Sequence, residues 1–325
     1  MASLIERYRD RLPVTVDTPV VSLGEGSTPL LPAPRISRRL GVDLYLKWEG
    51  ANPTGSFKDR GMTVAISKAL ERRAGTVVCA STGNTAASAA AYAARAGIVA
   101  VVLQPEGAVS SGKLAQARAL GARILEVRGS FDEALSAARV LADRGTHVLV
   151  NSLNPDRLEG QKTAAFEIVE ELGSTLDVLA LPYGGGGNVT AYAHGFAESG
   201  AQPRLVAGEA AERGTTVASA IRIGTPAHAA TAAEALASSG GTAVRLADEA
   251  ILDAWRELAR EEGVFCEPSS AAGLAALGTV ELERGSVVVC VVTGHGLKDP
   301  DTAARLSPEP VAVDPEPDAI AEASR

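Results

Sequence analysis

The rest of the chain is organised around residues 47–61, which read Lys47-Trp48-Glu49-Gly50-Ala51-Asn52-Pro53-Thr54-Gly55-Ser56-Phe57-Lys58-Asp59-Arg60-Gly61. Asn-Pro-Thr-Gly is the chemistry of a tight turn, and the sequence that follows, as far as Glu71, is typical of a helix. Ser56 precedes Asp59 by three residues, which is the spacing of a capping pattern. Lys58 is therefore predicted at the junction of loop and helix.

A lysine in that position is biased toward its neutral form. The positive end of the helix dipole raises the free energy of an ammonium group, and burial does the same. Both effects favour the free amine, which is the form that attacks carbonyl groups. The alternative is a solvated lysine on a first helical turn.

Composition narrows the class of protein. A length of 325 residues suggests two lobes. The formal net charge of −8 argues against nucleic acid as a partner. No apolar run is long enough to span a bilayer, and no signal peptide is visible. The cysteines Cys79, Cys266 and Cys290 lie far apart, which is typical of free thiols in a reducing cytoplasm, and the histidines lack metal-ligand spacing.

Short apolar runs alternate with helical segments along most of the chain. Continuous runs of this length are typical of parallel strands buried on both faces, so the sequence predicts an α/β, doubly wound fold. We expect strands at residues 42–48, 76–80, 98–103, 123–127, 148–150, 177–181, 204–208 and 286–292. Besides the helix after Lys58, we expect helices at residues 4–10, 84–96, 112–120, 130–143, 160–171, 189–198, 216–223, 247–263 and 270–277.

A run of glycines, Gly184-Gly185-Gly186-Gly187-Asn188, lies between an expected strand and an expected helix. Successive glycines allow backbone N–H groups to turn inward as an anion-binding nest, and the helix N-terminus adds its dipole. A flexible linker is the alternative, but the strand–glycine–helix order favours a phosphate site.

Three further polar segments also follow expected strands. Ser81-Thr82-Gly83-Asn84-Thr85 opens a helix, where its groups either bind a phosphate or carboxylate or simply cap the helix. Asn151 and Ser152 precede Arg157, which either binds a phosphate in a bidentate fork or lies solvated beside a turn. Thr293 opens Thr293-Gly294-His295-Gly296 after the last apolar strand.

Five motifs, in this order, resemble pyridoxal-phosphate enzymes of the β family, also called fold type II, and the threonine synthases most. They are the segments 52–60, 81–85, 151–155, 220–224 and 293–299, and the resemblance extends over residues 20 to 302. It implies the two-domain, doubly wound open-sheet fold of the tryptophan synthase β-like enzymes, with pyridoxal 5′-phosphate as cofactor.

The resemblance also implies how the chain is divided. A large cofactor-binding domain would consist of residues 1–49 and 146–306, and a small mobile domain of residues 50–145, with the site in the cleft at the carboxyl ends of the strands. Residues 307–325 carry prolines, acids and alanines without period, which predicts a disordered tail. A homodimer is a further expectation of the family.

Residue roles follow from the same motifs. Lys58 would hold the cofactor as a Schiff base and serve as acid and base, so His295 is interpreted as structural. Asn84 would bind the 3′-oxygen of the cofactor, and the hydroxyl of Thr293 would face its pyridine nitrogen without fully protonating it, which suits elimination and replacement. The cofactor phosphate would be held by Gly184, Gly185, Gly186, Gly187 and Asn188. The substrate would be held by Ser81, Thr82, Thr85, Asn151, Ser152 and Arg157, with Lys113 as a weaker candidate.

The activity implied is that of a cytoplasmic lyase of threonine biosynthesis, which converts O-phospho-L-homoserine and water to L-threonine and phosphate by γ-elimination and β-addition. One departure bears on the substrate. Threonine synthases commonly have glycine-asparagine-alanine-glycine-asparagine where this chain has four glycines, so Gly185 lacks any side-chain contact that the first asparagine makes with the substrate. Four glycines are more similar to the serine and threonine dehydratases.

A dehydratase is therefore the first alternative, opposed by segment 220–224, by Thr293-Gly294-His295-Gly296 and by Arg157. A non-catalytic homologue that binds an amino-acid phosphate or a partner is the second, and Lys58 opposes it. A nucleotide-binding α/β protein is the third, but the chain lacks both the G-x-G-x-x-G fingerprint and a Walker lysine.

Overall fold

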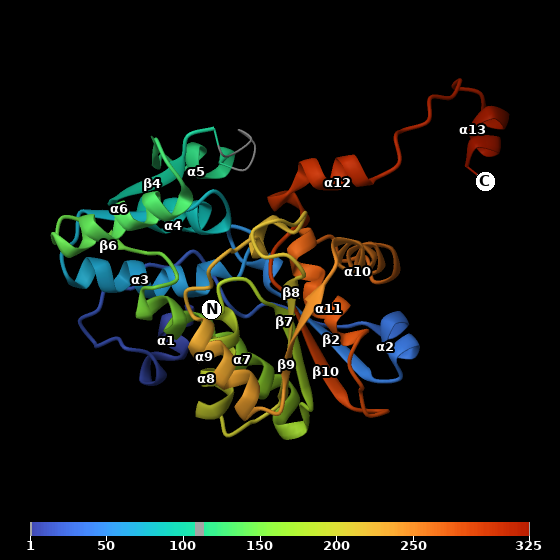
Figure 1. Cartoon of the computed structure of the whole chain (residues 1–325), viewed down its shortest axis with the longest axis horizontal. Coiled ribbons are helices and arrows are strands. Elements are labelled where there is room, and N and C mark those ends of the chain that lie inside the picture. Colours follow the sequence, from blue (N-terminus) through green and yellow to red (C-terminus); the bar gives the residue numbers. More distant parts are fainter. Residues whose placement is uncertain (1, 108–113, 325) are drawn as a thin grey trace.

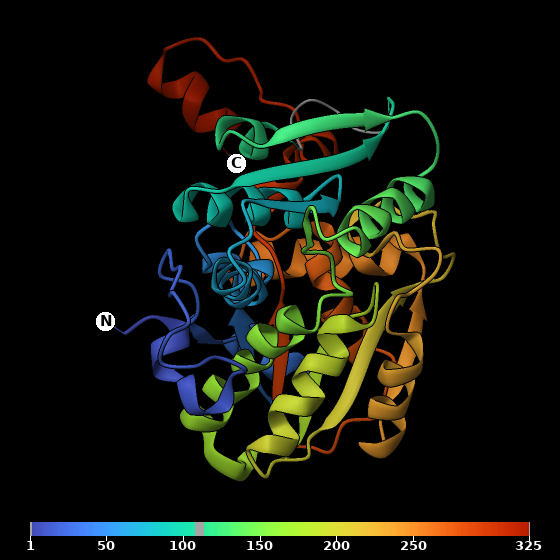
Figure 2. The same cartoon turned by 90° about the vertical axis from the view of Figure 1, so that its left-hand side faces the viewer.

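The computed structural model describes residues 2–107 and 114–324, and within them the strands form two open sheets (Figure 1). The larger sheet has six strands in the order β1-β2-β10-β7-β8-β9, and the smaller has four in the order β5-β4-β3-β6. Within the described residues, the strands of both sheets pair in parallel except β1 with β2. Figure 2 shows the smaller sheet lying above the larger one, with helices around both. The prediction of an α/β, doubly wound fold with parallel sheets is confirmed.

The strands of the larger sheet are β1 (Leu30–Pro32), β2 (Asp43–Trp48), β7 (Val178–Pro182), β8 (Arg204–Ala210), β9 (Thr242–Leu246) and β10 (Val287–Val292). Those of the smaller sheet are β3 (Thr76–Ala80), β4 (Val99–Pro105), β5 (Arg123–Val127) and β6 (Val148–Leu149). The expected strands are all present with small shifts at their ends. The sequence missed β1, which is short and contains a proline, and β9, an edge strand whose residues are mostly exposed and so form no apolar run.

The helices in chain order are α1 (Leu4–Arg7), α2 (Pro34–Leu40), α3 (Lys58–Glu71), α4 (Asn84–Ala96), α5 (Ala115–Ala119), α6 (Phe131–Asp143), α7 (Pro155–Leu172), α8 (Gly187–Glu198), α9 (Ala229–Ser238), α10 (Asp248–Glu261), α11 (Ala272–Leu277), α12 (Pro300–Leu306) and α13 (Pro317–Ala323). The helix expected over 130–143 begins at a capping box of Ser130 and Glu133, as the sequence indicates. The sequence does not predict helices α2, α9, α12 and α13.

Two expected helices differ from the structure. Helix α7 begins at Pro155 and not near residue 160, because the side chain of Asn154 accepts the N–H of Asp156 at 2.9 Å and proline suits the first helical position. The expected helix at 216–223 is reduced to a single turn at Ser219–Ile221. The start of the helix expected at 112, and Lys113 with it, lie outside the described residues.

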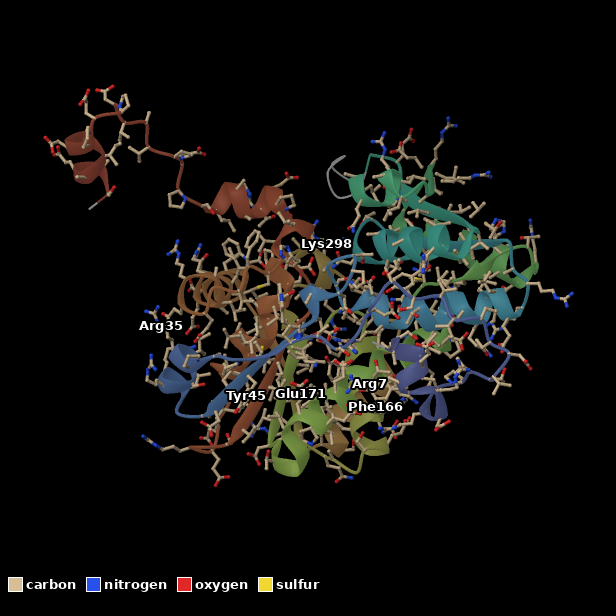
Figure 3. All side chains as sticks on the ribbon, turned by 180° about the vertical axis from the view of Figure 1, so that it is seen from behind. Arg7, Arg35, Tyr45, Phe166, Glu171 and Lys298 are labelled. Atoms are coloured by element: carbon tan, nitrogen blue, oxygen red, sulfur yellow. The ribbon has the colours of Figure 1, made fainter. Side chains whose placement is uncertain are left out.

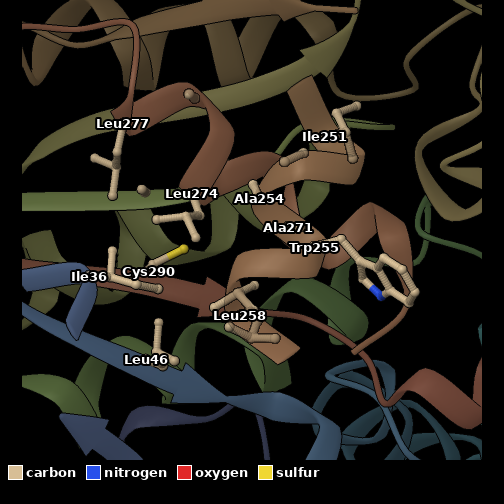
Figure 4. Packing of buried hydrophobic residues seen from close by; sticks show 14 of the residues in the cluster. Ile36, Leu46, Ile251, Ala254, Trp255, Leu258, Ala271, Leu274, Leu277 and Cys290 are labelled. Carbon is tan, nitrogen blue, oxygen red and sulfur yellow. The ribbon is translucent and has the colours of Figure 1, made fainter. Parts of the chain in front are cut away.

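The large sheet is buried on both faces, which explains its continuous apolar runs. Along β10, Val288, Cys290 and Val292 face the cluster made with α2, α10 and α11, whereas Val289 and Val291 face the cluster made with α7, α8 and α9. Figure 4 shows the first of these clusters, in which side chains from α2, α10 and α11 pack over Leu46 and Cys290. Each fully buried aliphatic side chain of this kind contributes about 1.5–3 kcal/mol relative to an exposed one.

The smaller sheet is sandwiched in the same way. Val77 and Cys79 of β3 pack with α3, α4 and α5, and Val78 and Ala80 pack with α6. Strand β6 pairs with β3, so the smaller sheet continues past residue 145, where the sequence placed the end of the small domain.

The C-terminal region is peripheral. Within residues 307–324, where the sequence predicts a disordered tail, α13 has no buried residue. In Figure 1 this helix stands away from the two sheets. No helix among the described residues is long and apolar enough to cross a membrane.

Candidate active site

The loop that precedes Lys58 pairs with the segment that follows β10. The N–H of Phe57 donates to the carbonyl of Thr293 at 3.1 Å, and the N–H of His295 donates to the carbonyl of Gly55 at 2.9 Å. Ser56 and Gly294 form an isolated antiparallel bridge between these two bonds. Lys58, the first residue of α3, is thereby held next to Thr293 at the carboxyl end of the large sheet.

The predicted capping of α3 by Ser56 is wrong. Phe57 occupies the N-cap position and makes no side-chain capping bond. The carboxylate of Asp59 instead accepts the N–H of Thr54 at 2.7 Å and the hydroxyls of Thr54 and Ser88, each at 2.6 Å. Asp59 therefore fastens the turn at Thr54 to α4, while the buried hydroxyl of Ser56 has no partner among the described residues.

Lys58 has the properties of a nucleophilic amine. Burial lowers the pKa of Lys58 to about 7, the guanidinium of Arg157 lowers it as well, and the carboxylate of Glu267 acts in the opposite direction. A large share of the side chain is then uncharged near neutral pH, as attack on a carbonyl requires.

A buried ionic cluster fixes the first turn of α3. Arg60 is fully buried and donates to Glu49 at 2.7 and 2.8 Å and to Glu167 at 2.6 and 2.7 Å. Lys47 of β2 reaches Glu167 at 2.9 Å. Burial alone would raise the pKa of Glu167, but Arg60 and Lys47 lower it to about 2, so it stays ionised. The cluster ties α3 to β2 and α7, and so holds the backbone of Lys58 in place.

Glu267 is a buried acid in this site that the sequence analysis missed. Its carboxylate accepts the side-chain amide N–H of Asn84 at 2.9 Å, and its own N–H donates to the carbonyl of Gly294 at 3.1 Å. A Cβ on Gly294 would lie 2.4 Å from Glu267 Oε1, so glycine is required there. In the sequence Glu267 reads as a helix-starting acid before Pro268, and only its long-range contacts mark it as part of the site.

Thr293 is buried and lies in a hydroxyl pair. Its Oγ1 is 2.9 Å from the Oγ of Ser270, which also accepts the N–H of Gly294 at 2.8 Å. Ser270 was also missed, because a serine before an apolar helix has the ordinary signature of a helix start. The pair holds the Thr293 hydroxyl in one orientation.

The glycine run forms a turn between β7 and α8 in which a side chain is excluded at Gly186 and crowded at Gly184 but not at Gly185. Gly186 has φ +82°, and a Cβ there would lie 2.8 Å from the carbonyl oxygen of His228. At Gly184 a Cβ would come 3.2 Å from the Cα of Ile221, whereas nothing lies within 4 Å at Gly185. Both polar atoms of the Asn188 side chain are buried without a partner among the described residues. A backbone nest with an unused amide beside it fits an anion.

Arg157 is not the solvated arginine of the alternative interpretation. It is fully buried, and its Nη1 donates to the carbonyl of Val150 at 2.7 Å. Its Nε and Nη2 have no partner in the part of the chain that the structure describes. Burial lowers the pKa of Arg157 to about 10, which leaves it charged at neutral pH. A buried guanidinium with two unused donor atoms is suited to an anionic ligand.

The other predicted substrate residues lie at the ends of β3 and β6. Asn151 exchanges two hydrogen bonds with the backbone of Ala80, at 2.8 and 2.9 Å, so most of its side chain joins the two strands. Ser81 accepts the N–H groups of Gly83 and Ala86 at 3.2 Å, which ties it to the turn before α4 and to the first turn of that helix. Thr82, Thr85 and Ser152 are half-buried on the same turns.

Two more side chains link the parts of the site. Lys298, which Figure 3 shows between the two sheets, donates to the carbonyl of Thr54 at 3.1 Å and to the side chain of Gln116 in α5 at 2.6 Å. His228 lies with its Nε2 2.8 Å from the carbonyl oxygen of Ser152. Among the described residues, no group of three or more His, Cys, Asp or Glu side chains is placed to hold a metal ion.

Comparisons with known proteins find similarity over most of the chain. The family model described as pyridoxal-phosphate dependent enzyme matches residues 21–294. The threonine synthase of Mycobacterium tuberculosis is 52% identical over 337 residues, covering 96% of this chain and 93% of the relative. That of Halalkalibacterium halodurans is 49% identical over 320 residues, covering 92% and 90%.

Solved structures show the same fold. Maize serine racemase superposes with a TM-score of 0.73 at 23% identity, covering 86% of this chain and 91% of that one. The T.th. threonine deaminase superposes with a TM-score of 0.69 at 28% identity, covering 82% and 92%. The racemase, at its low identity, supports the fold alone.

Proposed function

The chain belongs to the family of pyridoxal-phosphate dependent enzymes, and from that premise we propose that it is a threonine synthase, a lyase that converts O-phospho-L-homoserine and water to L-threonine and phosphate. Its identity of about half to curated threonine synthases, over nearly their whole length, supports this activity.

The residues present fit the cofactor. Pyridoxal phosphate, when bound, supplies an electron sink that stabilises negative charge on the substrate carbons. Lys58 would form the covalent link, Asn84 would bind the ring oxygen, and Thr293 would face the ring nitrogen. The cup of Gly184, Gly185, Gly186, Gly187 and Asn188 would take the phosphate, and the unpartnered amide of Asn188 supports that assignment.

The amine of Lys58 would move the protons in the reaction. The Lys58 Nζ would accept the proton from the substrate Cα and return protons further along the substrate. A pKa of about 7 lets the same group accept and donate near neutral pH. The Thr293 hydroxyl, held by Ser270, would bind the ring nitrogen without transferring a full proton to it.

We expect Arg157 to be the residue that distinguishes between the candidate substrates. A buried guanidinium with two unpartnered donor atoms next to Lys58 fits the γ-phosphate of O-phosphohomoserine, which must be positioned and then released as an anion. Thr82, Thr85 and Ser152 would assist from neighbouring turns, and Ser81 and Asn151 would contribute only the hydrogen-bonding capacity left by their backbone contacts.

A threonine or serine dehydratase is the second candidate, favoured by the four glycines and by the fold that the chain shares with the T.th. threonine deaminase. Its substrates carry no phosphate, so a dehydratase would leave Arg157 without a phosphate to bind. The two functions are separated by measuring phosphate release from O-phosphohomoserine beside ketoacid formation from L-threonine. Efficient deamination without phosphate release would replace our proposal with the dehydratase.

The division into a large and a small mobile domain, a homodimer and a cytoplasmic location are part of the same proposal. The three buried free cysteines support a reducing compartment.

A further inference from the structure

His228 contacts both proposed anion sites of the enzyme, namely the glycine cup at residues 184–188 and the segment after β6 that leads to Arg157. It immediately precedes α9 and is half-buried. Its backbone N–H donates to the carbonyl of Gly185 at 2.9 Å, and its carbonyl packs on Gly186 so closely that no side chain fits there. Its ring lies against Gly187, where a Cβ would be 3.3 Å from the Cδ2 atom. One residue thus contacts three glycines of the cup.

The imidazole of His228 points from the cup to the segment that follows β6. Its Nε2 lies 2.8 Å from the carbonyl oxygen of Ser152. A carbonyl oxygen only accepts hydrogen bonds, so Nε2 carries the proton and donates it. Ser152 belongs to the segment that leads from β6 of the smaller sheet to Arg157, whereas the cup lies at the end of β7 in the larger sheet.

We propose that His228 is a positioning residue that sets the separation of the cofactor-phosphate cup from the substrate-phosphate segment, and so favours substrates that carry a γ-phosphate. This inference rests on the proposed function. A cofactor held by its own phosphate would fix the position of the reacting carbons. The γ-phosphate of the substrate can then contact Arg157 only if the distance between the glycine cup and the segment that leads to Arg157 matches the length of the substrate. The hydrogen bond from His228 Nε2 to the carbonyl of Ser152 is the side-chain contact that would hold the two sites at this distance.

The test compares two variants of the cofactor-loaded protein. His228→Phe keeps the ring volume and the backbone bond to Gly185 but removes the Nε2 donor, whereas His228→Gln retains an N–H at a similar distance. His194→Phe, at an exposed position on α8, is the matched control. For each we would measure KM and kcat with O-phosphohomoserine, and by calorimetry the Kd of inorganic phosphate for the loaded protein, whose cup is already filled.

We expect His228→Phe to raise both the KM and the phosphate Kd about tenfold, the effect of one lost hydrogen bond, with a much smaller change in kcat. His228→Gln should recover most of the loss, and His194→Phe should change nothing. Unchanged constants in His228→Phe, equal defects in the Phe and Gln variants, or loss of cofactor as the main defect would each overturn the inference while leaving the proposed function intact. A wild-type protein that releases no phosphate would overturn both.

Discussion

The backbone N–H of Phe57 donates to the carbonyl of Thr293, 3.1 Å away, although 236 positions separate the two residues in the sequence. This bond places the residue that would link the cofactor next to the residue that would face its ring nitrogen. On the proposed roles, this backbone pairing would set where the cofactor ring can lie.

The pKa of Lys58 predicts how covalent cofactor capture depends on pH. Because burial lowers that pKa to about 7, the neutral amine should dominate above this value and the ammonium below it. The rate of covalent capture by apo-protein should rise as pH increases through about 7 and then level off. Stopped-flow absorbance of the lysine-linked cofactor would measure it. Lys58→Ala should form no such link, and Lys68→Ala, further along the same helix, should behave as the wild type; a midpoint near the usual value of a lysine would contradict the prediction.

Replacement of Thr293 should change the course of the reaction more than substrate binding. Thr293→Asp would place a carboxylate at the ring nitrogen, favour its protonation and make the ring a stronger electron sink. We expect slower threonine formation and a larger share of side products, measured by chromatographic product analysis. Thr279→Asp, on a turn away from the site, is the control, and an unchanged product ratio in Thr293→Asp would remove Thr293 from its proposed role.

Arg157→Ala should separate phosphate chemistry from cofactor binding. Loss of a charge-assisted contact to a leaving phosphate should lower turnover of O-phosphohomoserine about a hundredfold. The covalent link to Lys58 should remain, because the cofactor phosphate would lie in the glycine cup. Initial phosphate release and the visible spectrum would be measured together, with Arg95→Ala on the exposed side of α4 as control. Equal losses of phosphate release and of threonine deamination would show that Arg157 is not a phosphate ligand.

The buried cluster around Arg60 should matter for stability far more than surface ion pairs do. Arg60→Met leaves Glu49 and Glu167 buried without their main partner, which should lower the free energy of unfolding by about 3–5 kcal/mol. Arg39→Met removes an ion pair with Glu257 in which the arginine is half-exposed. It should change the free energy of unfolding by less than about 1 kcal/mol. Urea unfolding of the apo-protein would compare them. Similar effects of the two substitutions would indicate that water or a shifted side chain compensates for Arg60.

The sequence by itself determined the features that depend on local pattern. Apolar runs between helices predict β3, β7 and β10, because strands buried on both faces need apolar residues at every position. Turn residues before a helix predicted Lys58 at the start of α3, and the glycine run predicted the turn between β7 and α8. Edge strand β9 escaped because its exposed residues leave no such pattern.

Only the tertiary structure decided which polar groups keep hydrogen-bonding capacity for a ligand. Ser56 and Asp59 have the spacing of a capping pattern, yet the carboxylate of Asp59 accepts hydrogen bonds from Thr54 and Ser88 instead. Asn151 reads as a ligand, yet its amide is largely occupied by Ala80. Glu267 and His228 read as ordinary residues, and only their partners far away in the chain connect them with the proposed site. Burial and hydrogen-bond partners are set by distant segments, and local sequence carries no record of them.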